Sequence, residues 1–304
     1  MGAACAKANP YEDDVEWSPQ KPPQKPVVLD EPAFEASPRA ADKGPEPLVY
    51  ENSCFFPTTF LQAPLLRREP HAGGSQLLTF GLPAGKALDL PCCGALLAQG
   101  GGSAKPYTPI SAQDTVGEFT LAVKVYPDGT VSKALGEVAV GGTVGFKHLG
   151  RLVSIAYGSS GFDGVSHITM LAAGSGITPC YQAILKCMTT AGDSTTVTLL
   201  YGSKTDADIM LRSELDALAA TAGERLTVVH TLSGEEKEGF ENGWIDQEKI
   251  ERLAPPPAED GSHKVFVCGL PAMYEALCGA RGEPLADGSV LAALGHSASN
   301  VVKL

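Results

Sequence analysis

The second half of the chain alternates strand-like and helix-like segments. From about residue 166, five segments are typical of strands: HITMLAAG, TVTLLYG, LTVVHTL, KVFVCG and the final NVVKL. The segments between them are expected helices: PCYQAILKCM, LRSELDALAA, DQEKIERL and PAMYEALCG. Strands that alternate with helices at this spacing form a parallel sheet covered on both faces, which predicts a doubly wound α/β domain. Ligands bind such sheets beyond the carboxyl ends of the strands.

The loop after the first of these strands is therefore a candidate binding site. In AAGSGITP, Gly174 and Gly176 flank Ser175 and let the backbone approach a ligand closely. Thr178 is expected to cap the helix that follows, and free amides at a helix start suit an anion. A purely structural turn explains the pattern equally well. Four residues spaced i, i+3, i+4 and i+7 are expected to seat this helix on the sheet. They are Tyr181, Ile184, Leu185 and Met188.

The last strand end, VCGLPAM, repeats this arrangement. Cys268 stands at the tip of the strand and Gly269 in the turn, while Pro271 opens a helix that contains Met273. A small polarizable thiol at this point could touch a ligand ring, and a buried structural cysteine is the competing interpretation. YGSKTDADIM adds a third polar loop after a strand.

Residues 48 to about 160 are predicted to form β-structure. FTLAVKVY alternates between two faces. One face holds Phe119, Leu121, Val123 and Val125, and the other holds Thr120, Ala122, Lys124 and Tyr126. The second face, with its lysine and aromatic tip, is unusual for plain solvent exposure. Further strands are expected near QLLTFGL, KALDL and TVGFK, and several short strands separated by glycine and proline predict a barrel or sandwich.

Two further segments of this region are candidates for ligand binding. SAKPYTPIS contains Lys105, Pro106, Tyr107 and Thr108. Its prolines exclude a helix, so we expect either an ordinary turn or a loop that holds a flat, negatively charged ligand. In DGTVSKAL, Gly129 and Ser132 stand at an expected helix start, which suits phosphate, and a hairpin turn at residues 128–129 is the alternative.

Composition limits the function classes. A net charge of −12 argues against nucleic acid as a partner, because phosphate binding needs a basic surface. No run of about 18 apolar residues, the length of a membrane span, is found. The eight cysteines lack metal-type spacing, which indicates a reducing compartment with free thiols and no zinc. The six histidines show no pairing of the kind that nucleophilic catalysis needs.

Residues 1–47 form a separate segment. Nine of the 23 prolines fall there, and apolar residues repeat with no strand or helix period, so a disordered or partner-binding tail is expected. MGAACAKA resembles an N-terminal lipidation signal, except that Ala6 stands where Ser or Thr is required. We expect a cytoplasmic protein, and leave open a peripheral membrane contact through the N-terminus and a larger assembly through the tail.

Six segments, taken in order, resemble the cytochrome b5 reductases and the reductase module of plant nitrate reductase. They are KPYTPIS, VKVY, GTVS, GSGITP, LLYGSKTDADIMLRSEL and CGLPAM. The resemblance covers roughly residues 50 to 304. It implies the fold of the wider ferredoxin–NADP reductase superfamily. In that fold an FAD-binding antiparallel β-barrel, here residues 48–160, precedes a NAD(P)-binding α/β domain, here residues 161–304.

The resemblance also implies site residues. On the FAD side these are Lys105, Pro106, Tyr107, Thr108, Ala122, Lys124, Gly129, Val131, Ser132 and Thr178. On the nicotinamide side they are Gly174, Ser175, Gly176, Cys268, Gly269, Pro271 and Met273. The lysine would pair with phosphate and the tyrosine would lie against the flavin ring. Thr108 and Cys268 are the expected catalytic positions.

The implied activity is that of an FAD-dependent NADH or NADPH oxidoreductase. Hydride would pass from the nicotinamide to the flavin, and single electrons would then leave to a haem or iron–sulfur acceptor protein. Four departures from the family pattern favour the alternative of a weakly active or inactive subunit in a larger assembly. Lys105 replaces an arginine, AGSG replaces GGTG, FKHLGR replaces GPxG, and Ser233 replaces the acidic residue of NADH-preferring members.

Overall fold

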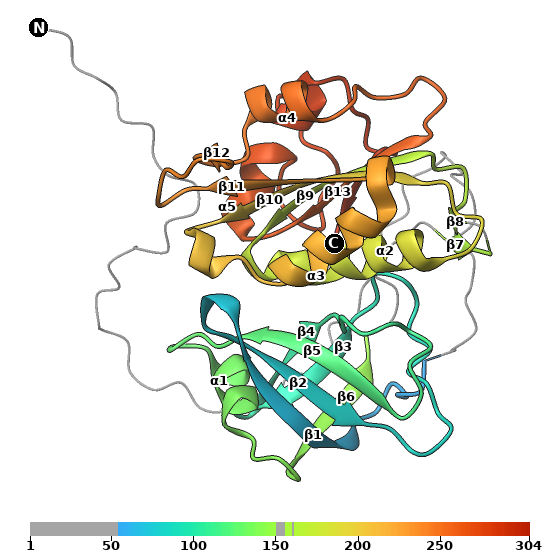
Figure 1. Ribbon diagram of the computed structural model, residues 1–304, viewed down its shortest axis with the longest axis vertical. Coiled ribbons are helices and arrows are strands. Elements are labelled where there is room, and N and C mark those ends of the chain that lie inside the picture. The colour runs from blue at the N-terminus through green and yellow to red at the C-terminus, as the bar shows by residue number, and fades with distance from the viewer. Residues whose placement is uncertain (1–53, 150–155, 160) are drawn as a thin grey trace, which may run out of the picture. The chain divides into compact units, whose positions relative to one another are not determined.

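The computed structural model describes residues 54–149, 156–159 and 161–304 (Figure 1). The expectations for residues 1–47 lie outside this part of the chain, as do the last two residues of FKHLGR. The described residues form an antiparallel β-domain followed by an α/β domain.

The described part of the β-domain contains six antiparallel strands and one α-helix. The strands are β1 (Leu61–His71), β2 (Ser75–Gly81), β3 (Leu96–Gly100), β4 (Ser103–Tyr107), β5 (Glu118–Lys124) and β6 (Thr143–His148), in the order β4-β3-β6-β1-β2-β5. The helix α1 (Thr130–Glu137) follows β5. The core holds Phe56, Phe80, Phe119 and Phe146, each at most 1% exposed. The antiparallel β-domain and its strands at QLLTFGL, FTLAVKVY and TVGFK are as predicted.

Two expectations for this domain were wrong. KALDL makes only the single bridge between Ala87 and Val116, because Asp89 has a φ of 50° that interrupts the extended backbone. The first five residues of SAKPYTPIS are strand β4 and not a loop. Pro106 fits because β4 is an edge strand, and an edge strand need not donate a hydrogen bond on its outer side.

The α/β domain is built on a six-stranded parallel sheet. Its strands are β9 (His167–Ala173), β10 (Thr196–Ser203), β11 (Leu226–Leu232), β12 (Glu241–Asn242), β13 (His263–Cys268) and β14 (Val301–Lys303), in the order β12-β11-β10-β9-β13-β14. From β9 the chain adds strands first on one side and then, with β13, on the other. The loops after β9 and β13 therefore meet at the point where the strand order reverses, which is where such sheets bind ligands.

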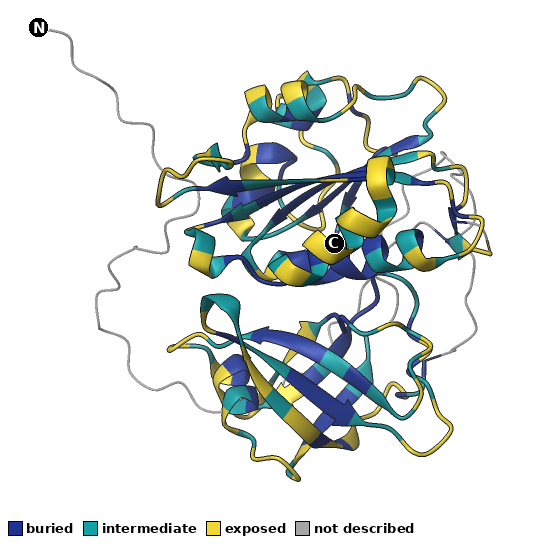
Figure 2. Cartoon of the chain, in the orientation of Figure 1, coloured by how far each residue is buried: buried dark blue, intermediate teal, exposed yellow. Residues whose placement is uncertain are grey.

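Helices cover both faces of this sheet, as predicted (Figure 1). They are α2 (Ile177–Thr189), α3 (Arg212–Ala222), α4 (Gln247–Leu253), α5 (Pro271–Leu277) and α6 (Val290–Ala293). The strands are the most deeply buried elements of the domain, and the outer helix surfaces are exposed (Figure 2). A short hairpin of β7 (Tyr157–Gly158) and β8 (Gly161–Phe162) precedes β9.

The buried face of α2 is wider than predicted. Tyr181 and Ile184 are buried, but Leu185 and Met188 are only partly so, while Cys180 and its neighbours at 183 and 187 are fully buried. The reason is that α2 packs on the sheet and also against the β-domain. Gln182 Nε2 donates to the carbonyl of Pro109 at 3.0 Å. A helix with contacts on two sides buries more than one stripe.

None of the helices in the described ranges is long and apolar enough to cross a membrane. The same residues contain no cluster of His, Cys, Asp or Glu side chains that could hold a metal ion. Their seven cysteines are free thiols.

Candidate functional site

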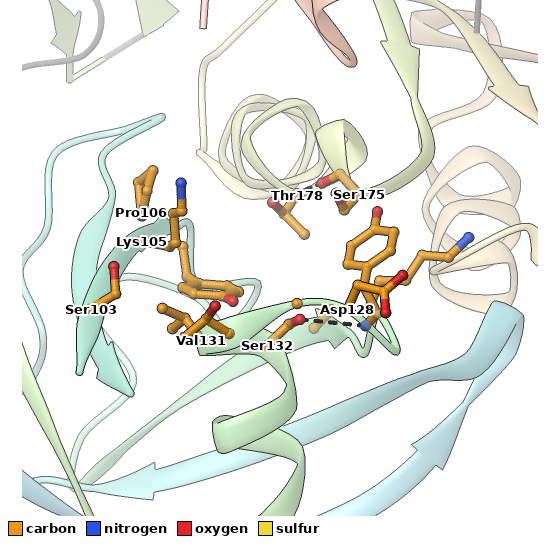
Figure 3. A pocket seen from close by; sticks show the side chains of 14 residues that line it. Ser103, Lys105, Pro106, Asp128, Val131, Ser132, Ser175 and Thr178 are labelled. Atoms are coloured by element: carbon orange, nitrogen blue, oxygen red, sulfur yellow. Dashed lines mark hydrogen bonds between the residues drawn. The ribbon is translucent and has the colours of Figure 1, made fainter. Parts of the chain in front are cut away.

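A cavity of about 650 Å³ lies beside β4, β5 and the start of α1 (Figure 3). This volume is in the range of cofactor and small-molecule sites. The cavity is lined by Ser103, Lys105, Pro106, Tyr107, Ala122, Lys124, Tyr126, Asp128, Gly129, Thr130, Val131, Ser132, Ser175 and Thr178. Ten of the predicted site residues therefore come together around one space.

Strand β4 supplies one wall of the cavity. Lys105 and Pro106 are exposed and Tyr107 is partly buried. Burial, with a smaller contribution from Tyr126, raises the pKa of the Tyr107 hydroxyl to about 12. The hydroxyl therefore stays protonated at neutral pH and can donate a hydrogen bond. This wall offers an exposed cation and a flat aromatic surface to the same cavity.

The first turn of α1 lies on a second side, where Figure 3 shows Val131 and Ser132. Gly129 is the N-cap residue and provides no side-chain cap, and the first turn contains no acidic residue. A Cβ at Gly129 would lie 2.2 Å from Ser132 Oγ and 3.1 Å from Tyr126 Cβ, so a larger residue there would displace the Ser132 hydroxyl. Uncapped amides at a helix start carry a partial positive charge. This side of the cavity suits a phosphate.

The outer face of β5 supplies a third side. Ala122 is 4% exposed and presents a small surface, and Lys124 and Tyr126 follow it on the same face. The ammonium group of Lys124 lies 6.0 Å from the centre of the Tyr126 ring and 3.7 Å from a carboxylate oxygen of Asp208. This explains why that face of FTLAVKVY is not a plain solvent face.

The loop after β9 faces these walls through Ser175 and Thr178. The prediction that Thr178 caps α2 was wrong. The helix begins at Ile177 after Gly176, and Thr178 Oγ1 donates to the carbonyl of Ser175 at 3.2 Å from within the first turn. The threonine hydroxyl is thereby held at the cavity, 8% exposed.

Seven predicted site residues do not line this cavity. They are Thr108, Gly174, Gly176, Cys268, Gly269, Pro271 and Met273. Thr108 follows β4 and is buried, 7% exposed. Gly174, Gly176, Cys268 and Gly269 lie at the ends of β9 and β13, which are paired through Ala172 and Cys268. Pro271 and Met273 lie in the first turn of α5, which follows β13.

The ends of β9 and β13 touch through their backbones. A Cβ at Gly176 would lie 2.3 Å from the carbonyl oxygen of Cys268, so Gly176 permits this close approach. The nearby Gly174 has a φ of 54° and open space around it. Met273 is fully buried beneath Gly269. Both glycines were expected to let the backbone approach a ligand. Gly176 instead lets the ends of β9 and β13 approach each other, whereas the backbone at Gly174 remains accessible.

The Cys268 thiol is held in its protonated form. Burial raises its pKa to about 11. Its Sγ lies 3.9 Å from the main-chain oxygen of Leu304, which also accepts a hydrogen bond of 2.5 Å from the Tyr274 hydroxyl. A protonated, partly buried thiol can pack against a ligand but is a poor nucleophile.

A charged cluster lies at the ends of β10 and β11. Arg212 and Lys237 both donate to the carboxylate of Asp206, and the hydrogen bond from Lys237 is the main reason that the pKa of Asp206 is lowered. Both cations stand over the ring of Phe240, at 5.2 Å and 5.6 Å from its centre. Glu235 accepts from the Asp206 amide at 2.5 Å.

Ser233, one of the four departures from the pattern of the resemblance, lies beside this cluster. Its amide donates to the carbonyl of Ser203 at 3.0 Å, and its hydroxyl donates to the same oxygen at 3.4 Å. It brings no charge to the end of β11.

Sequence reasoning missed four residues that line the cavity. They are Ser103, Tyr126, Asp128 and Thr130. The two-residue period of β5 places Tyr126 on the same face as Lys124, so this signal was present in the sequence. Ser103, Asp128 and Thr130 carry no pattern of their own. Ser103 lines the cavity because it begins β4, and Asp128 and Thr130 line it because they flank Gly129.

The cavity fits a flavin nucleotide. The uncapped amides of α1 and the exposed Lys105 ammonium suit a diphosphate, and the ring of Tyr107 offers a stacking surface. The hydroxyls of Ser132 and Thr178, both buried residues that line the cavity, would provide polar contacts to it. The residues present are therefore those that an FAD site needs.

Comparison with known proteins agrees with this fit. An oxidoreductase FAD-binding domain model matches residues 65–153, and an oxidoreductase NAD-binding domain model matches residues 170–279. NADH–cytochrome b5 reductase 2 of Mycosarcoma maydis is 34% identical over 259 residues, which cover 80% of this chain and 72% of that protein. The chain belongs to the NADH–cytochrome b5 reductase family.

Other members of the family give the same result. NADH–cytochrome b5 reductase 2 of Yarrowia lipolytica is 37% identical over 228 residues, 72% of this chain and 76% of that protein. Among solved structures, the cytochrome b5 reductase domain of Ulva prolifera nitrate reductase superposes with a TM-score of 0.70 at 27% identity, covering 82% of this chain and 98% of that domain. The predicted resemblance, fold class and cofactors are confirmed: the chain is an FAD-dependent oxidoreductase that uses a nicotinamide nucleotide.

Proposed function

We propose that this chain oxidises NADH and NADPH and passes the electrons singly to cytochrome b5 or a similar haem protein. The observation that supports this most is the position of the cavity. It is lined by the β-domain on three sides and by Ser175 and Thr178, which lie at the strand-order reversal of the nucleotide-binding sheet. When bound, FAD accepts hydride from the nicotinamide and releases electrons one at a time.

The residues of the chain orient the two cofactors. Lys105 and the α1 amides would hold the diphosphate, Tyr107 would support the flavin ring, and the Thr178 hydroxyl would contact the ring from the side of α2. On the nicotinamide side, the accessible backbone at Gly174 and the protonated thiol of Cys268 would bound the ring. Orientation of this kind, without an acid or base, is what such a transfer needs.

The acceptor is tested by turnover with two oxidants. We expect NADH to support rapid reduction of ferricyanide, a small acceptor that needs no docking, and also of purified cytochrome b5. A chain that reduces ferricyanide and fails with cytochrome b5 would contradict the proposed acceptor. A chain whose flavin is not reduced by either nucleotide would contradict the proposed function as a whole, and would favour the inactive-subunit alternative.

We further propose that the chain discriminates weakly between NADH and NADPH. In this fold a carboxylate near the end of a strand holds the ribose of NADH, and a nearby cation accommodates the extra phosphate of NADPH. Here Ser233 is uncharged, and the carboxylates of Asp206 and Glu235 already have partners. Arg212 and Lys237, which are the two partners of Asp206, stand together at the same place.

Charge changes at this cluster test the proposal. We expect Ser233→Asp to lower the rate with NADPH relative to NADH, and Lys237→Ala to do the same. The matched control is Lys249→Ala, which removes a cation from α4, where Lys249 pairs with Asp246 at 2.9 Å. A wild-type chain that strongly rejects NADPH would contradict weak discrimination.

A further inference from the structure

The turn between β1 and β2 contacts the loop that leads into α3. The backbone amide of Leu211 donates a hydrogen bond to His71 Nε2 at 2.9 Å. A Cβ at Gly73 would lie 2.8 Å from the carbonyl oxygen of Asp208, so the two backbones are in direct contact. Beside them, Lys124 Nζ lies 3.7 Å from Asp208 Oδ1. Three contacts therefore join one turn and one strand of the β-domain to a single loop of the α/β domain.

The β-domain side of this contact has a fixed conformation. Gly73 and Gly74 have φ values of 64° and 68°, which glycine adopts without strain. The Ser75 hydroxyl donates to the carbonyl of Ala72 at 2.5 Å. The amide of Val125 donates to the carbonyl of Gly74 at 3.3 Å, which attaches the turn to the residue after Lys124. The turn is therefore tied to β5, the strand that lines the cavity.

The loop side is equally constrained. Thr205 and Asp208 cap the short helix η3 (Asp206–Asp208), with a hydrogen bond of 2.7 Å between their side chains. Ile209, Met210 and Leu211 are buried, each at most 1% exposed. Leu211 has a φ of 58°, a conformation that residues other than glycine rarely adopt. This backbone directs the Leu211 amide, which precedes α3, toward His71.

The two sides carry different parts of the proposed reaction. Lys124 lines the flavin cavity, while Asp206 in the loop belongs to the charged cluster at the nucleotide end of the sheet. Hydride transfer requires reacting atoms about 3 to 3.5 Å apart, and an error of about 1 Å can cost a hundredfold in rate. Contacts that set the distance between these two parts therefore bear on the rate.

We propose that His71 is a positioning residue for hydride transfer. By accepting the Leu211 amide next to the Gly73–Asp208 contact, it fixes the nucleotide-side loop relative to the strand that lines the flavin cavity. This inference rests on the proposed function. It assigns a role to a histidine that touches neither the cavity nor the charged cluster.

Two matched pairs of variants test the proposal. His71→Leu removes the acceptor, whereas His71→Gln places an amide oxygen close to the position of Nε2 and keeps it. Gly73→Ala adds a methyl group against the backbone of Asp208. Gly74→Ala imposes the same left-handed strain in the same turn, but its Cβ would have no atom within 4 Å.

The first readout is independent of catalysis. In hydrogen–deuterium exchange, a peptide covering residues 205–212 should exchange faster in His71→Leu and Gly73→Ala than in wild type. His71→Gln and Gly74→Ala should retain the wild-type protection, because the hydrogen bond and the backbone contact are intact. Equal exchange in His71→Leu and His71→Gln would overturn the role of the acceptor.

The second readout is the limiting rate of flavin reduction at saturating NADH. It should fall at least about tenfold in His71→Leu and Gly73→Ala, while flavin content and nucleotide affinity change little, and it should stay near wild type in the two controls. Wild-type rates in His71→Leu would refute the positioning role. A wild-type chain that binds FAD but is not reduced by nucleotide would instead refute the proposed function, and the exchange experiment would still test the contact.

Discussion

Replacing Gly176 with alanine should slow flavin reduction without removing the flavin. The added Cβ would lie 2.3 Å from the carbonyl oxygen of Cys268, 2.6 Å from its carbonyl carbon and 2.9 Å from the amide nitrogen of Gly269. Because real Cβ contacts shorter than 3.0 Å essentially never occur, the backbones must separate by at least the difference, about 0.7 Å. All three atoms are backbone, so no side-chain rotation relieves the contact.

The displacement falls where the nicotinamide is expected to bind. A misplacement of about 1 Å can cost about a hundredfold in rate, so a shift of this size should lower the limiting rate of flavin reduction by at least about tenfold. The control is Gly202→Ala in β10. Its Cβ would have ordinary contacts, the nearest being the Ala172 carbonyl oxygen at 3.7 Å.

The assay is stopped-flow reduction by saturating NADH, with flavin content measured on the same samples. We expect Gly176→Ala to retain FAD and to be reduced slowly, and Gly202→Ala to match wild type. A wild-type rate in Gly176→Ala would refute the reasoning, because it would show that the ends of β9 and β13 can separate without consequence for the reaction. Loss of FAD in Gly176→Ala would also contradict it, since the glycine does not line the flavin cavity.

Three further predictions concern the flavin and the stability of the α/β domain. Tyr107→Ala should lose FAD more readily on dialysis, because it removes a stacking surface worth about 0.5–1.5 kcal/mol beyond burial; equal retention would argue against the assigned role. Lys105→Arg should tighten FAD in a titration, since a guanidinium can pair with two phosphate oxygens at once, and weaker binding would place the lysine away from the phosphate. The free energy of unfolding in urea should fall as the pH is lowered from about 6.5 to about 4, because burial lowers the pKa of His167 and of His296 to about 4. Between these two pH values the unfolded chain binds protons that the folded chain does not, so the stability is present above about pH 6.5 and is lost as the pH falls toward about 4. A free energy of unfolding that stays constant across this pH range would contradict the lowered pKa values of the two histidines.

The sequence predicted most of the α/β domain because each of its elements has a local signal. HITMLAAG and KVFVCG are short apolar runs followed by glycine, and they form β9 and β13 within about a residue of the expected bounds. Only two of the four residues expected on the buried face of α2 are buried there, and the other two are partly exposed. The periodicity of one helix cannot show that a second surface, from Pro109 of the β-domain, packs against it.

The residues on the flavin side of the site were predicted mainly from the order of the motifs that resemble a known family, and less from periodicity or turn chemistry. The prolines of SAKPYTPIS indicated a loop, and strand β4 forms because pairing with β3 at the edge of the sheet outweighs the local preference. The role of Gly176 depends on a contact with Cys268, about ninety residues away in the sequence, and such contacts leave no local signal. His71 is a similar case, because its partner Leu211 lies on another domain.

The measurement that tests the central claim most directly is anaerobic reduction of the purified full-length chain, followed by its visible spectrum. We predict a yellow protein with one FAD per chain, bleached by NADH and by NADPH at limiting rates within about tenfold of each other, a difference of at most about 1.4 kcal/mol. A protein that binds no flavin when FAD is supplied, or whose bound flavin keeps its colour with both nucleotides, would contradict the account.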